Sequence, residues 1–211
     1  MYLSPEIVFG FHGCDQKVYD RVVKNGKHLT ASENSHDWLG SGIYFWEGSY
    51  QRALEWAKDS EKIKDPAVIG AVIKLGNCVD LLDAEYLDQA KDAYQLLKEE
   101  FELLGEPLPK NKKVVDDISF VRELDCQVMM RMQQMNNDLI AEELGTDEKK
   151  AIQNHRDFID SVRGMFPEGE ALYENAGFRS KNHIQLCIVN PNAIIGYFDP
   201  KKRRNPNYKP V

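Results

Sequence analysis

Apolar residues follow two different patterns along the chain. Short runs rich in β-branched and aromatic residues occur at 7–11, 43–46, 67–75, 183–189 and 194–198. These runs predict strands, because such side chains pack well on a pleated surface. The longest, 67–75 (AVIGAVIKL), is predicted to be a central strand.

Two short helices are predicted between these strands. Asp15 is in position to cap one that ends before Gly26. Ser49 is in position to cap another, whose apolar face carries Ala53 and Trp56. Ser and Asp side chains favour such positions because they accept hydrogen bonds from the first free backbone N–H groups of a helix.

Between these strand-rich parts, apolar residues recur at helical spacing and predict three helices. The first is expected to run from an N-cap at Asp83 to Gly105, and the second from about residue 117 to 144. The third is expected to begin after Thr146 and to carry Phe158 and Val162.

The two patterns divide the chain. Residues 1–80 and 166–200 are predicted to form a β-rich body, which is interrupted by a three-helix insertion at 81–165. The insertion either packs on the body or forms a separate lobe. Residues 201–211 form a basic C-terminal tail.

Charge is distributed unevenly over the 211 residues, which carry a net charge of −7. The tail holds five basic residues and no acidic one, so the remainder has 22 basic and 34 acidic residues, or −12. An acidic body argues against broad, non-specific nucleic-acid binding. The tail either contacts phosphates or an acidic partner, or is a solvated end.

The cysteines and the hydropathy indicate a cytoplasmic protein. The four cysteines are far apart and form no CxxC pair, which argues against a zinc ribbon and a disulfide framework: Cys14, Cys78, Cys126 and Cys187. No apolar run approaches the roughly 20 residues of a membrane helix. The apolar run at 7–11 has no preceding basic residue, so a signal peptide is not expected.

Several common catalytic motifs are absent. Gly40-Ser41-Gly42 suggests a dinucleotide loop, but the third glycine of GxGxxG would fall at Phe45. The sequence contains no P-loop, GxSxG or HExxH motif, and the histidines lack metal-ligand spacing. We therefore expect no metal site.

Two motifs near the N-terminus carry candidate chemistry. His12-Gly13 ends a predicted strand and places an imidazole beside an accessible backbone amide. The glycines at 40–42 allow a flat ligand to approach the backbone, and Tyr44 offers an aromatic face. The alternatives are a histidine bonded to a turn and an aromatic core.

A third motif lies on the predicted strand at 183–189. Strand alternation places His183, Gln185 and Cys187 on one face and Ile184 and Leu186 on the other. A polar face indicates a binding surface or an edge strand with one solvated face.

Taken in order, these motifs resemble the ADP-ribosyltransferase fold of the diphtheria-toxin and poly(ADP-ribose) polymerase class. The matches are His12-Gly13, the GxGIYF segment at 40–45 with Ser49, and Gln185 where the class usually has glutamate. The resemblance implies an α+β fold with two small, mainly antiparallel sheets around an NAD cleft. It does not extend to the helical insertion.

The resemblance also implies roles for individual residues. His12 would bind the adenosine ribose of NAD, and Gln185 would bind the nicotinamide ribose. The Gly13 backbone would pair with the carboxamide, and the Tyr44 ring would stack on the nicotinamide. Together with Glu174 as a replacement carboxylate, the expected site comprises His12, Gly13, Ser32, Gly42, Tyr44, Ser49, Tyr50 and Gln185. NAD is the expected substrate.

Glutamine at 185 retains hydrogen bonding but lacks the charge and the base function of glutamate. The resemblance then favours transfer of a single ADP-ribose over polymer synthesis. Glu170 or Glu174, in the loop before the strand, would supply a carboxylate. Tyr173, Phe178 and Arg179 in that loop are expected to contact the target.

The implied function is a mono-ADP-ribosyltransferase with a protein or nucleic-acid acceptor. A toxin-like enzyme would need an inhibitor or antitoxin protein, for which the helical insertion is a candidate docking surface. Three other functions remain open: an inactive module that binds NAD or ADP-ribose, an RNA 2′-phosphotransferase and a helical interaction protein.

Overall fold

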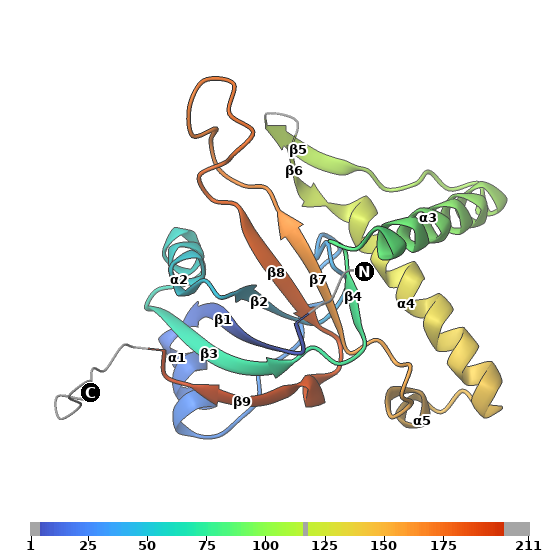
Figure 1. Ribbon diagram of the computed structural model, residues 1–211, viewed down its shortest axis with the longest axis horizontal. Coiled ribbons are helices and arrows are strands. Elements are labelled where there is room, and N and C mark those ends of the chain that lie inside the picture. The colour runs from blue at the N-terminus through green and yellow to red at the C-terminus, as the bar shows by residue number, and fades with distance from the viewer. Residues whose placement is uncertain (1–4, 116–117, 201–211) are drawn as a thin grey trace.

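The computed structural model describes residues 5–115 and 118–200 and shows an α+β fold (Figure 1). Its main sheet has the strand order β4-β7-β8-β2-β1-β3-β9 and is antiparallel except between β4 and β7. These strands are β1 (Ile7–Asp15), β2 (Ile43–Glu47), β3 (Pro66–Lys74), β4 (Cys78–Asp80), β7 (Ser161–Phe166), β8 (His183–Ile188) and β9 (Ile194–Phe198). A separate hairpin joins β5 (Asn111–Val115) and β6 (Ile118–Arg122).

The helices differ greatly in length. Two long helices, α3 (Ala84–Leu104) and α4 (Glu123–Leu144), pack against each other beside the sheet. The shorter helices are α1 (Gln16–Tyr19), a π-helical turn (Asp20–Lys24), α2 (Tyr50–Asp59), α5 (Lys149–Gln153) and a 3₁₀ turn (Pro191–Ala193). In the described part of the chain, no helix is long and apolar enough to cross a membrane.

The expected helix caps are confirmed. The side chains of Asp15, Ser49 and Asp83 each accept a hydrogen bond from a backbone N–H in the first turn of α1, α2 and α3. Helix α3 ends at Gly105, whose φ of 68° suits glycine. The five predicted strands are also present, within one or a few residues of the expected bounds.

The expectation of two small sheets around the cleft is wrong. The strands of the body form one seven-stranded sheet, and the second sheet is a hairpin inside the insertion. The reason is β2, which pairs with β1 through residues 46 and 47 and with β8 along residues 43–46. This strand therefore joins the two halves that were expected to be separate.

The predicted bounds of the second and third helices are also wrong. Residues 118–122 form β6, so α4 begins at Glu123. Helix α5 ends at Gln153, and Val162 lies in β7, between β4 and β8. The sequence 161–166 finds strand partners on both sides, and this tertiary pairing overrides its helix-like spacing. The insertion thus ends before β7 and contains a β-hairpin besides its helices. The basic tail at 201–211 lies outside the described residues.

The two faces of the sheet are covered differently. One face carries Phe45, Leu186 and Ile188 and packs against α1 and the π-helical turn through Tyr19 and Val22. The other face is covered twice. Helix α2 packs on it through a cluster of Trp46, Ala53 and Val68, and α3 and α4 pack on it through a cluster that includes Leu97, Met129, Val162 and Cys187. The insertion therefore shares a core with the sheet and is not a separate lobe.

Candidate functional site

A cleft opens where β1 and β2 separate. These strands pair only at Gly10↔Glu47 and Phe11↔Trp46, whereas β1 continues to pair with β3 as far as Asp15. From His12 onward β1 therefore leaves β2, and a cleft of about 350 Å³ occupies the gap. It brings together six residues that the sequence singled out: His12, Gly13, Ser32, Gly42, Tyr44 and Gln185.

His12 spans the two separating strands. Its Nδ1 lies 2.8 Å from the backbone oxygen of Tyr44. Because a carbonyl oxygen only accepts, Nδ1 carries the proton and Nε2 is left as an acceptor. Burial lowers the pKa of His12, so the ring is neutral near pH 7. His12 thus offers the cleft a neutral hydrogen-bond acceptor.

The Tyr44 hydroxyl holds the glycine turn that precedes β2. It accepts a hydrogen bond from the Leu39 N–H at 3.0 Å and donates one to the Gly40 oxygen at 2.8 Å. Burial raises the pKa of this phenol, so it stays protonated. The ring lines the cleft while the hydroxyl is committed to the turn, which leaves Tyr44 as an aromatic surface.

Gln185 projects into the cleft from β8 and is oriented by a tryptophan. The indole Nε1 of Trp38 donates to Gln185 Oε1 at 2.5 Å. This contact uses the acceptor end of the amide and leaves its NH₂ group as the available donor. Strand β8 lies between β7 and β2, so the alternative of an edge strand is excluded.

Two cleft glycines are required by packing. A Cβ atom at Gly13 would lie 2.2 Å from the backbone oxygen of Ala53, so glycine allows α2 to approach β1. A Cβ atom at Gly42 would lie 2.5 Å from the sulfur of Cys187. Gly42 also forms an isolated bridge with Ser32, and this bridge places the segment before the turn against the cleft.

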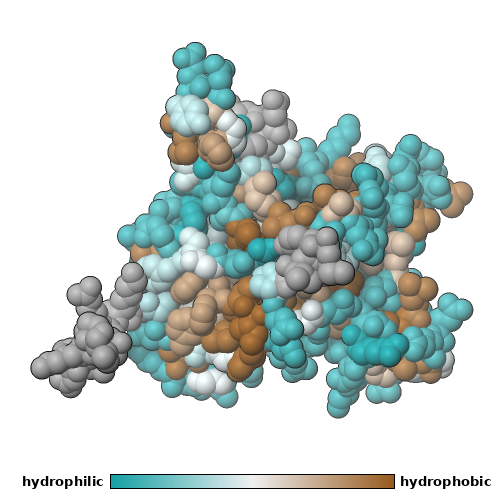
Figure 2. Space-filling model, in the orientation of Figure 1, coloured by the Kyte–Doolittle hydropathy of each residue, from teal (hydrophilic) through white to brown (hydrophobic). Residues whose placement is uncertain are grey.

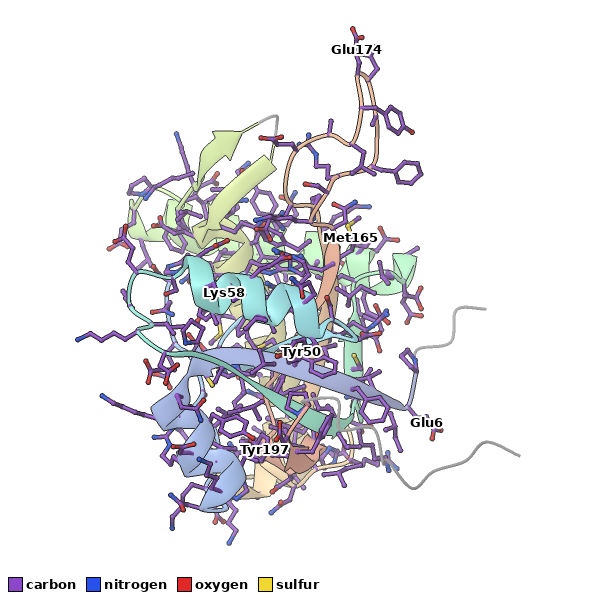
Figure 3. All side chains as sticks on the ribbon, turned by 90° about the vertical axis from the view of Figure 1, so that its left-hand side faces the viewer. Glu6, Tyr50, Lys58, Met165, Glu174 and Tyr197 are labelled. Atoms are coloured by element: carbon purple, nitrogen blue, oxygen red, sulfur yellow. The ribbon has the colours of Figure 1, made fainter. Side chains whose placement is uncertain are left out.

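Three expected site residues are not part of the cleft lining. Ser49 caps α2 through its Oγ, which accepts from the Arg52 N–H at 3.3 Å. Tyr50 packs edge-to-face on Phe11, with ring centroids 6.2 Å apart. Glu174 is exposed at the tip of the loop that projects between β7 and β8 (Figure 3).

Sequence reasoning missed two residues of the aromatic wall, Trp56 and Phe166. Trp38, Trp46, Trp56 and Phe166 all line the cleft. Trp56 had been assigned only to the apolar face of α2, yet it is 47% exposed and its ring lies 5.5 Å from that of Trp46. Phe166 was missed because β7 was not recognised as a strand. The helical spacing of Trp56 fits a buried face, so the sequence carried no signal for its exposure.

A group that resembles a metal site lies elsewhere, near the ends of α4 and α5. Ligand atoms of Glu143, His155 and Asp157 lie within 4.8 Å of one another. The backbone N–H of Asp157 approaches His155 Nδ1 at 3.3 Å, and the Asp157 carboxylate pairs with Arg156. Contacts within the protein therefore account for this group as a surface ion-pair cluster.

Comparisons with known proteins give one distant relative. The chain is 24% identical to an uncharacterized protein of Methanocaldococcus jannaschii, over 91% of this chain and 87% of that protein. No protein-family model matches the sequence. No solved structure matches it either.

Proposed function

We propose that this protein is a mono-ADP-ribosyltransferase that uses NAD as donor. The observation that carries the proposal is the meeting of His12, Tyr44 and Gln185 in one cleft, where β1 leaves β2. These residues come from separate parts of the chain, and each was singled out by the same family resemblance.

The lining of the cleft suits a flat aromatic ring, such as nicotinamide, and the ribose attached to it. Tyr44 and Trp56 present aromatic faces, and stacking on such a face contributes about 1–3 kcal/mol for a nucleic-acid base. The Nε2 atom of neutral His12 accepts from a ribose hydroxyl, and the Gln185 NH₂ donates to one. We assign the nicotinamide ribose to Gln185 and the adenosine ribose to His12.

Gln185 limits the chemistry in this proposal. Cleavage of the bond between nicotinamide and ribose develops positive charge on the sugar, and an amide stabilises this charge less than a carboxylate does. The catalytic contribution then comes chiefly from orientation of the donor. This supports a single transfer to each acceptor site.

The acceptor in this proposal is a macromolecule, either protein or nucleic acid. The loop between β7 and β8 projects from the body beside the cleft and carries apolar residues at its surface (Figure 2). Leu172, Tyr173 and Phe178 are 57%, 61% and 65% exposed, which is typical of a contact surface. If transfer harms the host cell, an inhibitor protein is a further expected partner.

One alternative has an observation in its favour. The indole N–H of Trp38 already donates to Gln185 Oε1, so this oxygen is not free to act on a substrate. This favours a module that binds NAD or ADP-ribose without turnover. An RNA 2′-phosphotransferase is less well supported. That reaction needs cationic side chains in the cleft, and among the described residues no lysine or arginine lines it.

The test is release of nicotinamide from NAD by the purified protein, with cell extract supplying acceptors. Trp56→Ala is expected to raise the KM for NAD by about tenfold or more, and Trp56→Phe to restore it, because stacking is regained. Trp56 is half-exposed, so both variants are expected to fold.

Three outcomes are informative. Nicotinamide release that depends on Trp56 supports the transferase. An NAD-induced rise in melting temperature without release supports the binding module. Neither release nor a shift in melting temperature contradicts both.

A further inference from the structure

A partly buried ion-pair cluster lies beside the aromatic wall, where β7 and β8 lead into the projecting loop. Arg52 of α2 pairs with Glu55 at 2.5 Å and with Glu168 Oε2 at 2.8 Å. The Arg52 side chain is 11% exposed, and that of Glu168 is 28% exposed. A guanidinium this well shielded requires opposite charges, and Glu168 supplies one while remaining accessible.

His183 connects this cluster to the cleft. Its ring stacks on Phe166 at 5.5 Å and lies 6.2 Å from Trp46, and both of these residues line the cleft. Its Nδ1 donates to the Lys181 oxygen at 2.8 Å and lies 3.7 Å from Glu168 Oε2. Burial lowers the pKa of His183, so its Nε2 is an acceptor near neutral pH.

Three buried polar atoms at this place have no hydrogen-bond partner among the described residues. They are the acceptor His183 Nε2 and the donors Trp46 Nε1 and Arg52 Nε. Buried polar atoms are nearly always paired, so these exceptions are consistent with a water molecule or another polar group that binds there. A hydroxyl or an amide offers both a donor and an acceptor, so such a group can pair with His183 Nε2 or with Trp46 Nε1.

The position of Glu168 is fixed by the base of the loop. Its backbone oxygen accepts from the Lys181 N–H at 2.9 Å, and its N–H donates to Asn182 Oδ1 at 3.3 Å. Arg52 binds Oε2, whereas Oε1 accepts no hydrogen bond from any described residue. Gln185 cannot accept a proton at neutral pH, and Glu174 is exposed at the loop tip.

We propose that Glu168 takes the proton from the acceptor, and that the acceptor presents a hydroxyl or an N–H group beside His183. This inference rests on the proposed transferase function. The bond between ribose C1′ and the nicotinamide nitrogen breaks, its electron pair stays on that nitrogen, and neutral nicotinamide leaves. The acceptor oxygen or nitrogen bonds to C1′, and its proton passes to the Glu168 carboxylate.

Glu168→Gln tests the proposal against Glu55→Gln, which removes the same charge from the other side of Arg52. Glu168→Gln is expected to lower kcat for transfer about 100-fold, in the range of general-base contributions, with the KM for NAD nearly unchanged. Glu168→Asp is expected to recover part of the rate. Glu55→Gln is expected to stay within about threefold of wild type, because the Glu55 carboxylate accepts hydrogen bonds from Gln51 and Arg52 of its own helix.

The pH profile provides a readout that a structural role would not change. In wild type, kcat is expected to depend on pH through the base that takes the acceptor's proton, and Glu168→Gln is expected to lack this dependence. The charged and titratable groups near Glu168 are Arg52 and Glu55 from α2, Lys181 at the end of the loop, and His183 at the start of β8. The pH profile of Glu55→Gln shows how far these neighbouring groups, rather than Glu168, change the pH dependence of kcat.

The outcomes separate this inference from the function on which it rests. No nicotinamide release by wild type overturns both. Wild-type turnover with an unimpaired Glu168→Gln, or equal losses in the Glu168 and Glu55 variants, overturns the role of Glu168 alone. If Glu168→Gln does not fold, Glu168→Asp with an unaltered kcat and pH profile overturns it.

Discussion

At the scale of single residues, the fold keeps two histidines neutral. Burial lowers the pKa of both His12 and His183, and in each case a backbone carbonyl accepts from Nδ1. The proton is therefore held on one nitrogen and the other is left as an acceptor. This arrangement suits a cleft that must bind hydroxyl groups without adding positive charge.

These shifts predict a loss of stability in mild acid. The unfolded chain binds a proton at each histidine below about pH 6.5, whereas the folded chain binds it only at a lower pH. The contribution of the two neutral histidines to the free energy of unfolding is therefore complete above about pH 6.5 and is lost as pH falls. The free energy of unfolding is expected to decrease between pH 7 and pH 5, by at most about 1.4 kcal/mol per pH unit for each histidine.

Urea unfolding at several pH values measures this effect. His12→Gln removes one titrating group, so its free energy of unfolding is expected to depend less steeply on pH than that of wild type. The double variant with His183→Gln is expected to be flatter still. Identical slopes in all three proteins would contradict the assignment.

At the scale of elements, the contact between β1 and α2 shapes the cleft. Gly13 lies where the backbone of α2 comes closest to β1, and any Cβ there would overlap the Ala53 oxygen. Helix α2 in turn carries Trp56 into the aromatic wall and Arg52 to Glu168. One glycine therefore sets the distance between a strand and a helix on which several cleft residues depend.

Gly13→Ala is expected to lower the free energy of unfolding by about 3 kcal/mol, because α2 must move away from the sheet. Gly196→Ala is the matched control, since Gly196 also lies in a strand and has open space around its Cβ position. That variant is expected to change stability by less than about 1 kcal/mol. Chemical denaturation of both checks this, and equal losses would show that the Gly13 contact does not limit the packing.

At the scale of the whole molecule, the insertion and the sheet are one structure. Their shared cluster includes Leu97 and Met129 from the long helices and Val162 and Cys187 from the sheet. Trp38 links the two regions further, because it lines both the cleft and an apolar pocket of about 310 Å³ against α3 and α4. Trp38 therefore connects the pocket beside the helices to Gln185, whose Oε1 accepts its indole N–H.

This shared core predicts cooperative unfolding. Far-UV circular dichroism reports mainly on the long helices α3 and α4, and fluorescence reports on the three tryptophans around the cleft. The two signals are expected to change at the same urea concentration, as for a single cooperative unit. Loss of helix before the change in tryptophan fluorescence would show that the insertion unfolds independently.

Local pattern was enough to locate most elements. The caps at Asp15, Ser49 and Asp83 and the stop at Gly105 depend on hydrogen bonds and dihedral preferences within a few residues. Alternation along β8 correctly placed Gln185 and Cys187 on one face, because side-chain direction in a strand follows from position alone. The α+β class followed from the same patterns.

Pairing between distant segments decided the rest. Residues 161–166 form β7 because β4 and β8 lie on either side of them, and this pairing adds β4 to the sheet and brings Phe166 to the cleft. The positions of Trp56 and Glu168 likewise depend on how α2 packs and where the loop begins. The sequence by itself determined five of the strands, the helix caps and the choice of His12, Tyr44 and Gln185 as candidate residues, because these rest on local geometry and local motifs. The tertiary structure alone decided the single sheet and the aromatic and charged surroundings of the cleft, because these arise from contacts between residues far apart in the chain.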